Sequence, residues 1–148
     1  MSAARRRDDA PKGPWLRPLR TPRRWLALGA AGVIATVAVS LLPGSGLPSS
    51  PFPGSDKVGH FLTYFALAAY AVMLFARMRP QALSAAGLIV LGVALEYAQA
   101  ALAEGRMGDS RDAVANALGV LAGLATASTP LALLLQRIDA RLADTRSS

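Results

Sequence analysis

The chain contains no cysteine and only one histidine, His60. The lack of cysteine excludes disulfide bonds, thiolate catalysis and cysteine-based zinc sites, and it leaves the redox compartment unreadable. A single histidine excludes an H-E-x-x-H pair, the helix motif of many zinc hydrolases. A lone histidine is also weak evidence for a metal site, so we expect no bound metal and no cofactor.

Charge is scarce along most of the chain, at 17% of residues, and it is unevenly placed. The formal net charge is +7, and residues 1–24 account for about +6 of it, with eight basic residues and two aspartates. This segment has little apolar periodicity, so we expect a disordered basic arm. No aromatic–basic surface accompanies the charge, and we expect no nucleic-acid partner.

Long apolar runs are abundant, with 53% hydrophobic residues and a mean hydropathy of +0.35. The runs cover residues 25–42, 58–76, 82–103 and 113–135. A soluble helix of this length would show a polar stripe, whereas these runs are apolar on all sides and predict lipid as the solvent. We predict an all-α, four-helix transmembrane bundle over residues 25–135, with a polar tail at 136–148. A cleaved signal peptide is the alternative for the first run, but no convincing A-x-A site follows it.

The placement of lysine and arginine predicts the orientation, because cytoplasmic loops are enriched in them. Three segments are basic: the N-terminal arm, the link with Arg77 and Arg79, and the C-terminal tail. The loop after the first run has only Lys57, and acids balance the basic residues of the loop after the third. We therefore expect a multi-pass protein of the bacterial inner membrane with both termini in the cytoplasm.

Polar residues at helical spacing form three stripes near the outer ends of the last three runs. The stripes comprise Asp56, His60 and Tyr64; Glu96 and Gln99; and Asp109, Asp112 and Asn116. Residues three or four apart share a helix face. Because an isolated ionised group in hydrocarbon is costly, we expect these stripes to converge, with Lys57 and Arg106, on one outward-facing site.

The motifs of these stripes resemble the VanZ-like family of small bacterial membrane proteins. The similar segments are D-K-x-x-H-F-x-x-Y from Asp56, E-x-x-Q from Glu96, and R-x-x-D-x-x-D-x-x-x-N-x-x-G from Arg106 to Gly119. They span residues 56–123, about half of the chain. The resemblance implies an association with the cell envelope, and one member of the family is linked to low-level resistance to teicoplanin. It implies no established reaction.

Several of these residues also have a purely structural interpretation. His60 either bonds across helices or transfers protons, and Glu96 either pairs with Lys57 or Arg106 or acts in a functional site. Asp109 suits the N-cap of the fourth helix, and Asp112 either supports that cap or belongs to the site. The small-xxx-small pair Gly119 and Gly123 predicts close helix packing.

Three functions fit this pattern. We expect the outer site to bind the head group of a lipid, a cell-wall precursor or a glycopeptide, with an influence on glycopeptide sensitivity. The alternative is an intramembrane acid–base enzyme acting on a lipid-linked substrate, with His60 as general base and Glu96 or Asp112 as its partner. The third is a helix bundle whose polar residues only lock the helices together. The expected partners are the lipid bilayer and, as an open alternative, further copies of the same chain in a homo-oligomer.

Overall fold

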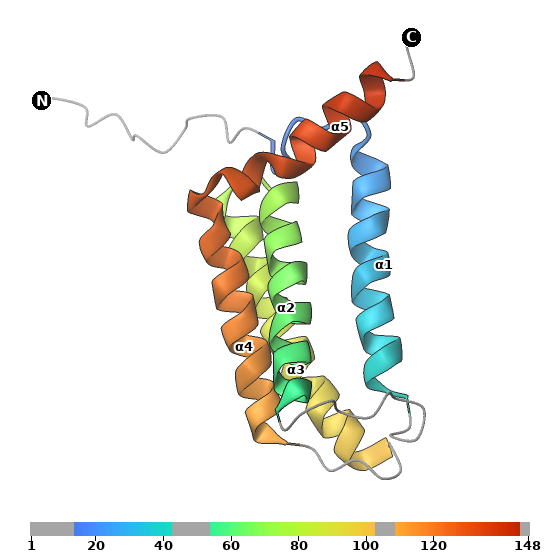
Figure 1. Ribbon diagram of the computed structural model, residues 1–148, viewed down its shortest axis with the longest axis vertical. Coiled ribbons are helices and arrows are strands. Elements are labelled where there is room, and N and C mark those ends of the chain that lie inside the picture. Colours follow the sequence, from blue (N-terminus) through green and yellow to red (C-terminus); the bar gives the residue numbers. More distant parts are fainter. Residues whose placement is uncertain (1–13, 43–53, 103–108, 146–148) are drawn as a thin grey trace, which may run out of the picture.

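The structure is a computed structural model, and it describes residues 14–42, 54–102 and 109–145 (Figure 1). The helices are α1 (Pro22–Ser40), α2 (Ser55–Leu74), α3 (Met78–Leu102), α4 (Ser110–Ala125) and α5 (Leu134–Asp144), with the 3₁₀ turns η2 (Thr126–Ser128) and η3 (Pro130–Leu133) between α4 and α5. The described part of the chain contains no β-strand beyond one isolated bridge. The predicted all-α class is confirmed.

Two helices, α2 and α3, are long and apolar enough to cross a membrane. Counting α4 together with the bent segment after it gives a third. The surfaces of these helices carry large exposed aliphatic side chains, among them Leu62, Leu83 and Val90. A soluble protein rarely exposes so much contiguous apolar surface, whereas lipid accepts it.

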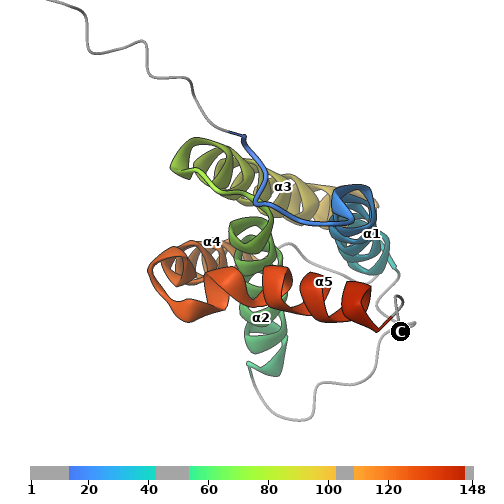
Figure 2. The ribbon, with the colours of Figure 1, turned by 90° about the horizontal axis from the view of Figure 1, so that it is seen from above.

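The fourth predicted span differs from the expectation of one continuous helix over residues 113–135. The chain bends by 79° between the α4 side and the α5 side of this segment. Pro130 has no N–H to continue a helical ladder, and Thr129 caps the next turn by accepting a hydrogen bond from the N–H of Leu131. The last turns therefore leave the bundle axis and cross its end (Figures 1 and 2).

The closest helix pair is α2 and α4, and α3 packs against both, while α1 stands to one side (Figure 2). The core where α2, α3 and α4 meet contains Tyr64, Ala68, Ala85, Leu88 and Val120. None of the residues of α1 is fully buried.

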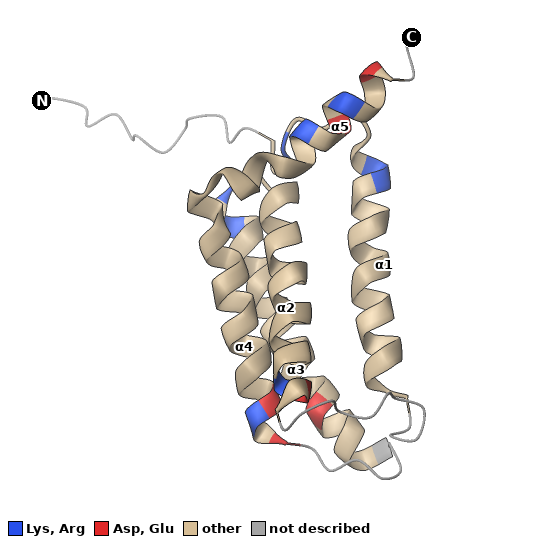
Figure 3. Cartoon of the chain, in the orientation of Figure 1, with Lys and Arg blue, Asp and Glu red and all other residues tan. Residues whose placement is uncertain are grey.

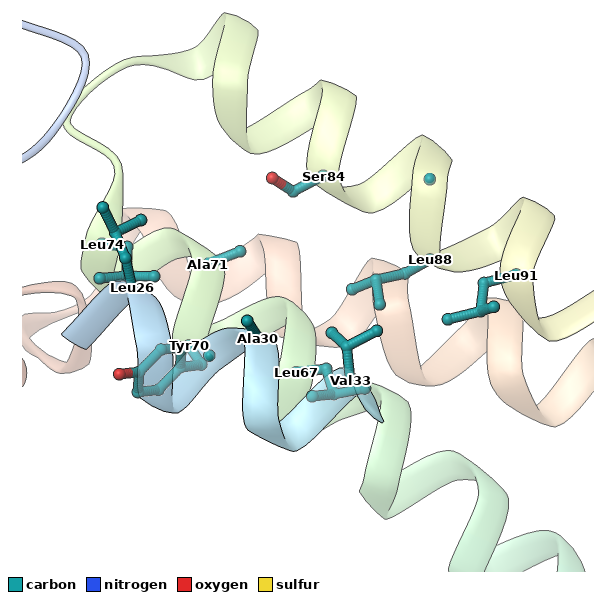
Figure 4. Close-up of a pocket in the computed structure, with 12 residues that line it drawn as sticks. Leu26, Ala30, Val33, Leu67, Tyr70, Ala71, Leu74, Ser84, Leu88 and Leu91 are labelled. Carbon is teal, nitrogen blue, oxygen red and sulfur yellow. The ribbon is translucent and has the colours of Figure 1, made fainter. Parts of the chain in front are cut away.

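An apolar cavity of about 350 Å³ lies between α1, α2 and α3. Figure 4 shows side chains from all three helices at its wall, including Val33 of α1, Leu67 of α2 and Leu88 of α3. Gly87 of α3 also borders this space, and a Cβ built there would meet nothing within 4 Å. The cavity therefore separates part of α1 from the rest of the bundle.

The described end of the basic arm is ordered, which differs from the expectation of disorder through residue 24. Residues 15–17 run antiparallel to the end of α2: the N–H of Arg17 donates to Leu74 O at 2.9 Å, and the N–H of Ala76 donates to Trp15 O at 2.8 Å. The Arg17 Nε also donates to Val72 O at 3.1 Å. These bonds fix the chain just before α1 begins at Pro22. Residues 1–13 lie outside the described residues.

Asp139 connects α5 to the start of α1 through hydrogen bonds. Its carboxylate is 4% exposed, and it accepts hydrogen bonds from the Thr21 hydroxyl at 2.7 Å, from the Trp25 indole N–H at 2.8 Å and from the Arg20 N–H. Thr21 makes no side-chain cap of its own, so a carboxylate from a distant helix occupies the positive end of the α1 dipole.

We predict that Asp139→Ala lowers the free energy of unfolding by about 2–4 kcal/mol, because it removes the shared acceptor of three partly buried hydrogen bonds. Denaturant unfolding of the purified chain in detergent, followed by circular dichroism, measures the change. Asp144→Asn is the matched control on the same helix: its ion pair with Arg20, at 3.5 Å, is exposed, so the change should stay within about 0.5 kcal/mol. Equal effects of the two substitutions would contradict the role given to Asp139.

Candidate functional site

The two ends of the bundle differ in charge (Figure 3). One end carries the arginines around α1, the α2–α3 link and α5, which are Arg17, Arg20, Arg23, Arg24, Arg77, Arg79, Arg137 and Arg141. At the other end, the described charged residues are Asp56, Lys57, Glu96, Asp109, Arg111 and Asp112. The second end therefore has an excess of two negative charges among the described residues, with His60 counted as neutral.

Three helices bring His60, Glu96 and Asp112 together at the acidic end. One ring nitrogen of His60 and one carboxylate oxygen from each acid all lie within 4.8 Å of one another. His60 Nε2 is 3.7 Å from Asp112 Oδ2. Glu96 is 7% exposed, and His60 and Asp112 are partly buried. The polar stripes of α2, α3 and α4 therefore meet at this point.

Asn116 holds the histidine ring from the other side. His60 Nδ1 lies 3.1 Å from Asn116 Oδ1, and Asn116 is almost fully buried. Because an amide oxygen only accepts, Nδ1 carries the proton in this contact. In a neutral imidazole the lone pair is then on Nε2, which is the nitrogen that faces Asp112.

Lys57 links the remaining carboxylates at the rim. Its ammonium nitrogen is 3.0 Å from Asp56, 3.0 Å from Asp109 and 3.2 Å from Asp112 Oδ1. Asp56 adjoins Lys57 in α2, whereas Asp109 and Asp112 are both at the start of α4, so Lys57 ties the start of α2 to the start of α4. It neutralises one of the charges that the acidic end gathers.

Asp109 caps α4, and its Oδ1 accepts from the Arg111 N–H at 2.9 Å. That N–H and the nearby Lys57 ammonium lower the pKa of the Asp109 carboxyl group below its usual value. The backbone N–H of Asp109 donates to Glu96 Oε2 at 3.3 Å. The positive end of the α4 dipole thus faces the carboxylates of Glu96 and Asp112.

Tyr64 lies beneath His60, one turn further along α2. Its ring packs against Gly92 of α3. A Cβ built on Gly92 would lie 3.3 Å from Tyr64 Cε1 and 3.2 Å from Asn116. Its hydroxyl oxygen is buried and has no hydrogen-bond partner among the described residues. It is close enough to Glu96 to interact with that carboxylate electrostatically.

Gln99, the other residue of the α3 stripe, has a structural partner. Its side-chain N–H donates to the carbonyl oxygen of Ser40 at 2.8 Å, so it joins α3 to the last turn of α1 rather than to His60. The helix-end carbonyls of α1 have no intrahelical donors, which is a need that the sequence of α3 alone could not reveal. Arg106 lies outside the described residues.

Gly119 and Gly123 lie on α4 where it touches α2. A Cβ on Gly119 would stand 2.3 Å from the carbonyl oxygen of Phe61, and one on Gly123 would stand 2.6 Å from that of Phe65. These backbones approach so closely that no side chain fits between them. This close approach sets the distance between His60 on α2 and the polar residues on α4.

Chemically, the site combines acids, an ammonium group and an imidazole at the end of an apolar bundle. Such a mixture suits a ligand with charges of both signs or with hydroxyl groups. The pair of His60 and Asp112 also has the residue types for proton transfer. Sequence spacing indicated these residues, but it missed Gly92, which lets Tyr64 and Asn116 approach α3.

The fold and the site together define an all-helical chain with two or three helices able to span a membrane and a charged cluster at one end. Comparisons with protein-family models, with curated proteins and with solved structures found no match.

We predict that Gly119→Ala lowers the free energy of unfolding by about 1–3 kcal/mol, because its methyl group would overlap the Phe61 carbonyl. Gly87→Ala is the matched control in α3, since its Cβ meets nothing within 4 Å, and it should leave stability unchanged or slightly raised. Thermal melting of both variants in detergent makes the comparison. If Gly119→Ala melted like the Gly87 variant, α2 and α4 would not be in backbone contact.

Proposed function

We propose that the chain is a four-span protein of the bacterial inner membrane that binds the polar head group of an amphiphile at its acidic, outward-facing end. In this arrangement α1 and α4 span the membrane together with α2 and α3. Support comes from the charge difference between the ends (Figure 3), since the end with eight described arginines matches a cytoplasmic face.

The amphipathic α5 fits the same arrangement. It crosses the end of the bundle that carries the arginines (Figure 1), with Leu135 and Asp139 buried and with Arg137 and Arg141 exposed. A helix with one buried face and arginines on the other suits the interface of an anionic membrane leaflet.

The length of α4 is compatible with a membrane span. α4 is about 24 Å long, which is short for a hydrocarbon core, and such a mismatch between helix and bilayer has a modest energetic cost.

The observation that carries the binding proposal is the cluster of His60, Glu96 and Asp112 with Lys57 at its rim. A carboxylate as buried as Glu96 in an apolar helix is by default a candidate functional residue. Cationic and anionic groups within a few ångströms of one another match a zwitterionic, phosphate-bearing or sugar-bearing head group. The resemblance to VanZ-like proteins supports an envelope ligand, such as a lipid, a cell-wall precursor or a glycopeptide.

The apolar cavity between α1, α2 and α3 supports an amphiphile over a fully polar ligand (Figure 4). Leu91 lines this cavity and precedes Glu96 by five residues, which is about 7.5 Å along the helix axis. A hydrocarbon chain in the cavity would therefore end near the level of the polar cluster. Head group and chain would each meet a matching surface.

The acid–base enzyme is the second candidate, and the contacts of His60 favour it. Asn116 fixes one nitrogen of the ring, and the other faces Asp112 at 3.7 Å. A positioned imidazole beside a carboxylate is the usual arrangement for general acid–base catalysis. Its substrate would be a lipid-linked molecule of the envelope.

The orientation is testable because the chain lacks cysteine. We predict that Ser110→Cys, at the start of α4, reacts with a membrane-impermeant maleimide in spheroplasts. Ser128→Cys, exposed in η2 just after the other end of α4, should react only after permeabilisation. Labelling of both from the same side would show that α4 does not cross the membrane, and the reverse pattern would place the acidic end in the cytoplasm.

Head-group binding is testable by native mass spectrometry of the full chain in detergent, with phosphatidylglycerol, phosphatidylethanolamine or teicoplanin added as the probe. We predict that at least one probe binds one per chain, and that Glu96→Gln and Lys57→Met each weaken it about tenfold or more, as expected for losing a charge-assisted contact. Tyr97→Phe is the matched control, because Tyr97 adjoins Glu96 but is 74% exposed.

Equal occupancy in all variants would contradict binding at the cluster. Loss of folded protein in the Glu96 and Lys57 variants, with unchanged binding per folded chain, would favour the purely structural bundle. An intermediate that accumulates in lipid extracts of cells carrying Glu96→Gln would favour the enzyme.

A further inference from the structure

The donor atoms around His60 lie close enough together to hold a metal ion. His60, Glu96 and Asp112 offer one nitrogen and two carboxylate oxygens that lie within 4.8 Å of one another. Donors on a cation with bonds of about 2.1 Å are separated by about 3.0–4.2 Å. The 3.7 Å between His60 Nε2 and Asp112 Oδ2 already lies in this range. The remaining separations need only small side-chain adjustments.

The second ring nitrogen of His60 is bound as in metal sites. Histidine ligands almost always donate their other N–H to an oxygen, which fixes the tautomer and aims the lone pair at the metal. Here Nδ1 lies 3.1 Å from Asn116 Oδ1, and Asn116 is 2% exposed. The lone pair is then on Nε2, the nitrogen 3.7 Å from Asp112 Oδ2. A lone pair facing carboxylate oxygens is unfavourable unless a proton or a cation lies between them.

Two buried polar atoms around the cluster have unused bonding capacity. The Tyr64 hydroxyl, in a side chain that is 2% exposed, has no hydrogen-bond partner among the described residues. Its ring and Asn116 both border Gly92 of α3, and the tyrosine is within electrostatic range of Glu96. Asp112 Oδ1 accepts no hydrogen bond among those residues, although Lys57 Nζ stands 3.2 Å away. A water bound to a cation would give the tyrosine a partner, since buried polar groups are normally satisfied.

Lys57 and His60 lie at different oxygens of the Asp112 carboxylate. Four described acids at this end face Lys57 and Arg111, and Lys57 contacts Asp56, Asp109 and Oδ1 of Asp112. Oδ2 of Asp112, on the same carboxylate, is the oxygen nearest His60. Lys57 therefore contacts one oxygen of Asp112, and the imidazole of His60 is nearest to the other.

We propose that His60 Nε2, Glu96 and Asp112 bind one divalent transition-metal ion, of the series from Mn²⁺ to Zn²⁺. An imidazole with two carboxylates is a borderline to hard donor set, which suits these ions better than Cu⁺ or the purely oxygen-loving Ca²⁺. Three protein ligands leave positions open for water or for an oxygen of a ligand. This inference replaces the sequence expectation of no metal, since two acids from other helices take the place of a second histidine.

The metal site stands on its own geometry, and it also bears on the proposed function. An open coordination position on the metal ion would accept a phosphate or carboxylate oxygen of a head group. The ion would polarise that group. Metal binding is measured without any lipid, so its failure and the failure of head-group binding are distinguishable.

The test is calorimetric titration of Zn²⁺, with Mn²⁺ electron paramagnetic resonance as a second probe, into the full chain in detergent. The protein is stripped with a chelator and purified through an affinity tag that contains no histidine. We expect one ion per chain, with a dissociation constant in the micromolar range or below. His60→Ala and Glu96→Gln should weaken binding at least 100-fold, and Asn116→Ala, which removes only the contact to Nδ1, about 10–100-fold.

Tyr97→Phe, next to Glu96 but outside the cluster, should bind like the unaltered chain. Circular dichroism and gel filtration establish that each variant is folded. If Glu96→Gln does not fold, Asp112→Asn replaces it, with the same expected loss. The proposal is overturned if the unaltered chain binds neither ion, or if folded His60 and acid variants bind as tightly as the unaltered chain.

Discussion

Ionisable groups in an apolar helix bundle are stable only where they meet polar partners at the same depth. Glu96 lies in the apolar helix α3 and is 7% exposed, so its carboxylate requires polar neighbours. The start of α4 supplies an N–H and the positive end of a helix dipole, and α2 supplies His60. Gly119 and Gly123 make this possible, because they let α4 approach the backbone of α2.

At the opposite end of the molecule, the charged groups have a different environment. There the only described acids are Asp139 and Asp144, and Asp139 is buried by donors from the start of α1. The arginines around it are largely at the surface, where water or anionic lipid head groups meet them. One end is thus a structural joint with a basic surface, and the other concentrates acids and a histidine between three helices. This difference supports a site at the acidic end.

The sequence predicted the helical class and the convergence of the polar stripes, because helical spacing and the cost of buried charge act locally and are visible in residue order. His60, Glu96, Asp112 and Asn116 meet as that reasoning required. The bend after α4 was missed, although Pro130 and the threonines before it were visible, because an apolar run hid the break. Gln99 was assigned to the site and Asp139 was not singled out within the predicted polar tail, because their partners, Ser40 and Trp25, are far away in the chain.

The N-terminal segment shows the same limit of local reasoning. Its arginines and prolines indicated disorder through residue 24, yet Arg17 bonds to the carbonyl oxygens of Val72 and Leu74 at the end of α2. Those carbonyls are the unsatisfied acceptors of a helix end, and only the folded bundle brings them next to the segment. Composition predicts the average behaviour of such a segment and misses a specific partner.

Whether Asn116 holds the ring of His60 beside Glu96 and Asp112 is measured by ¹⁵N NMR of the imidazole. Since the chain has one histidine, ¹⁵N-histidine labelling gives a single ring spectrum that needs no assignment. We expect a proton on Nδ1, and an Nε2 resonance that shifts in both Glu96→Gln and Asp112→Asn. An unprotonated Nδ1, with an Nε2 resonance that neither substitution moves, would contradict it.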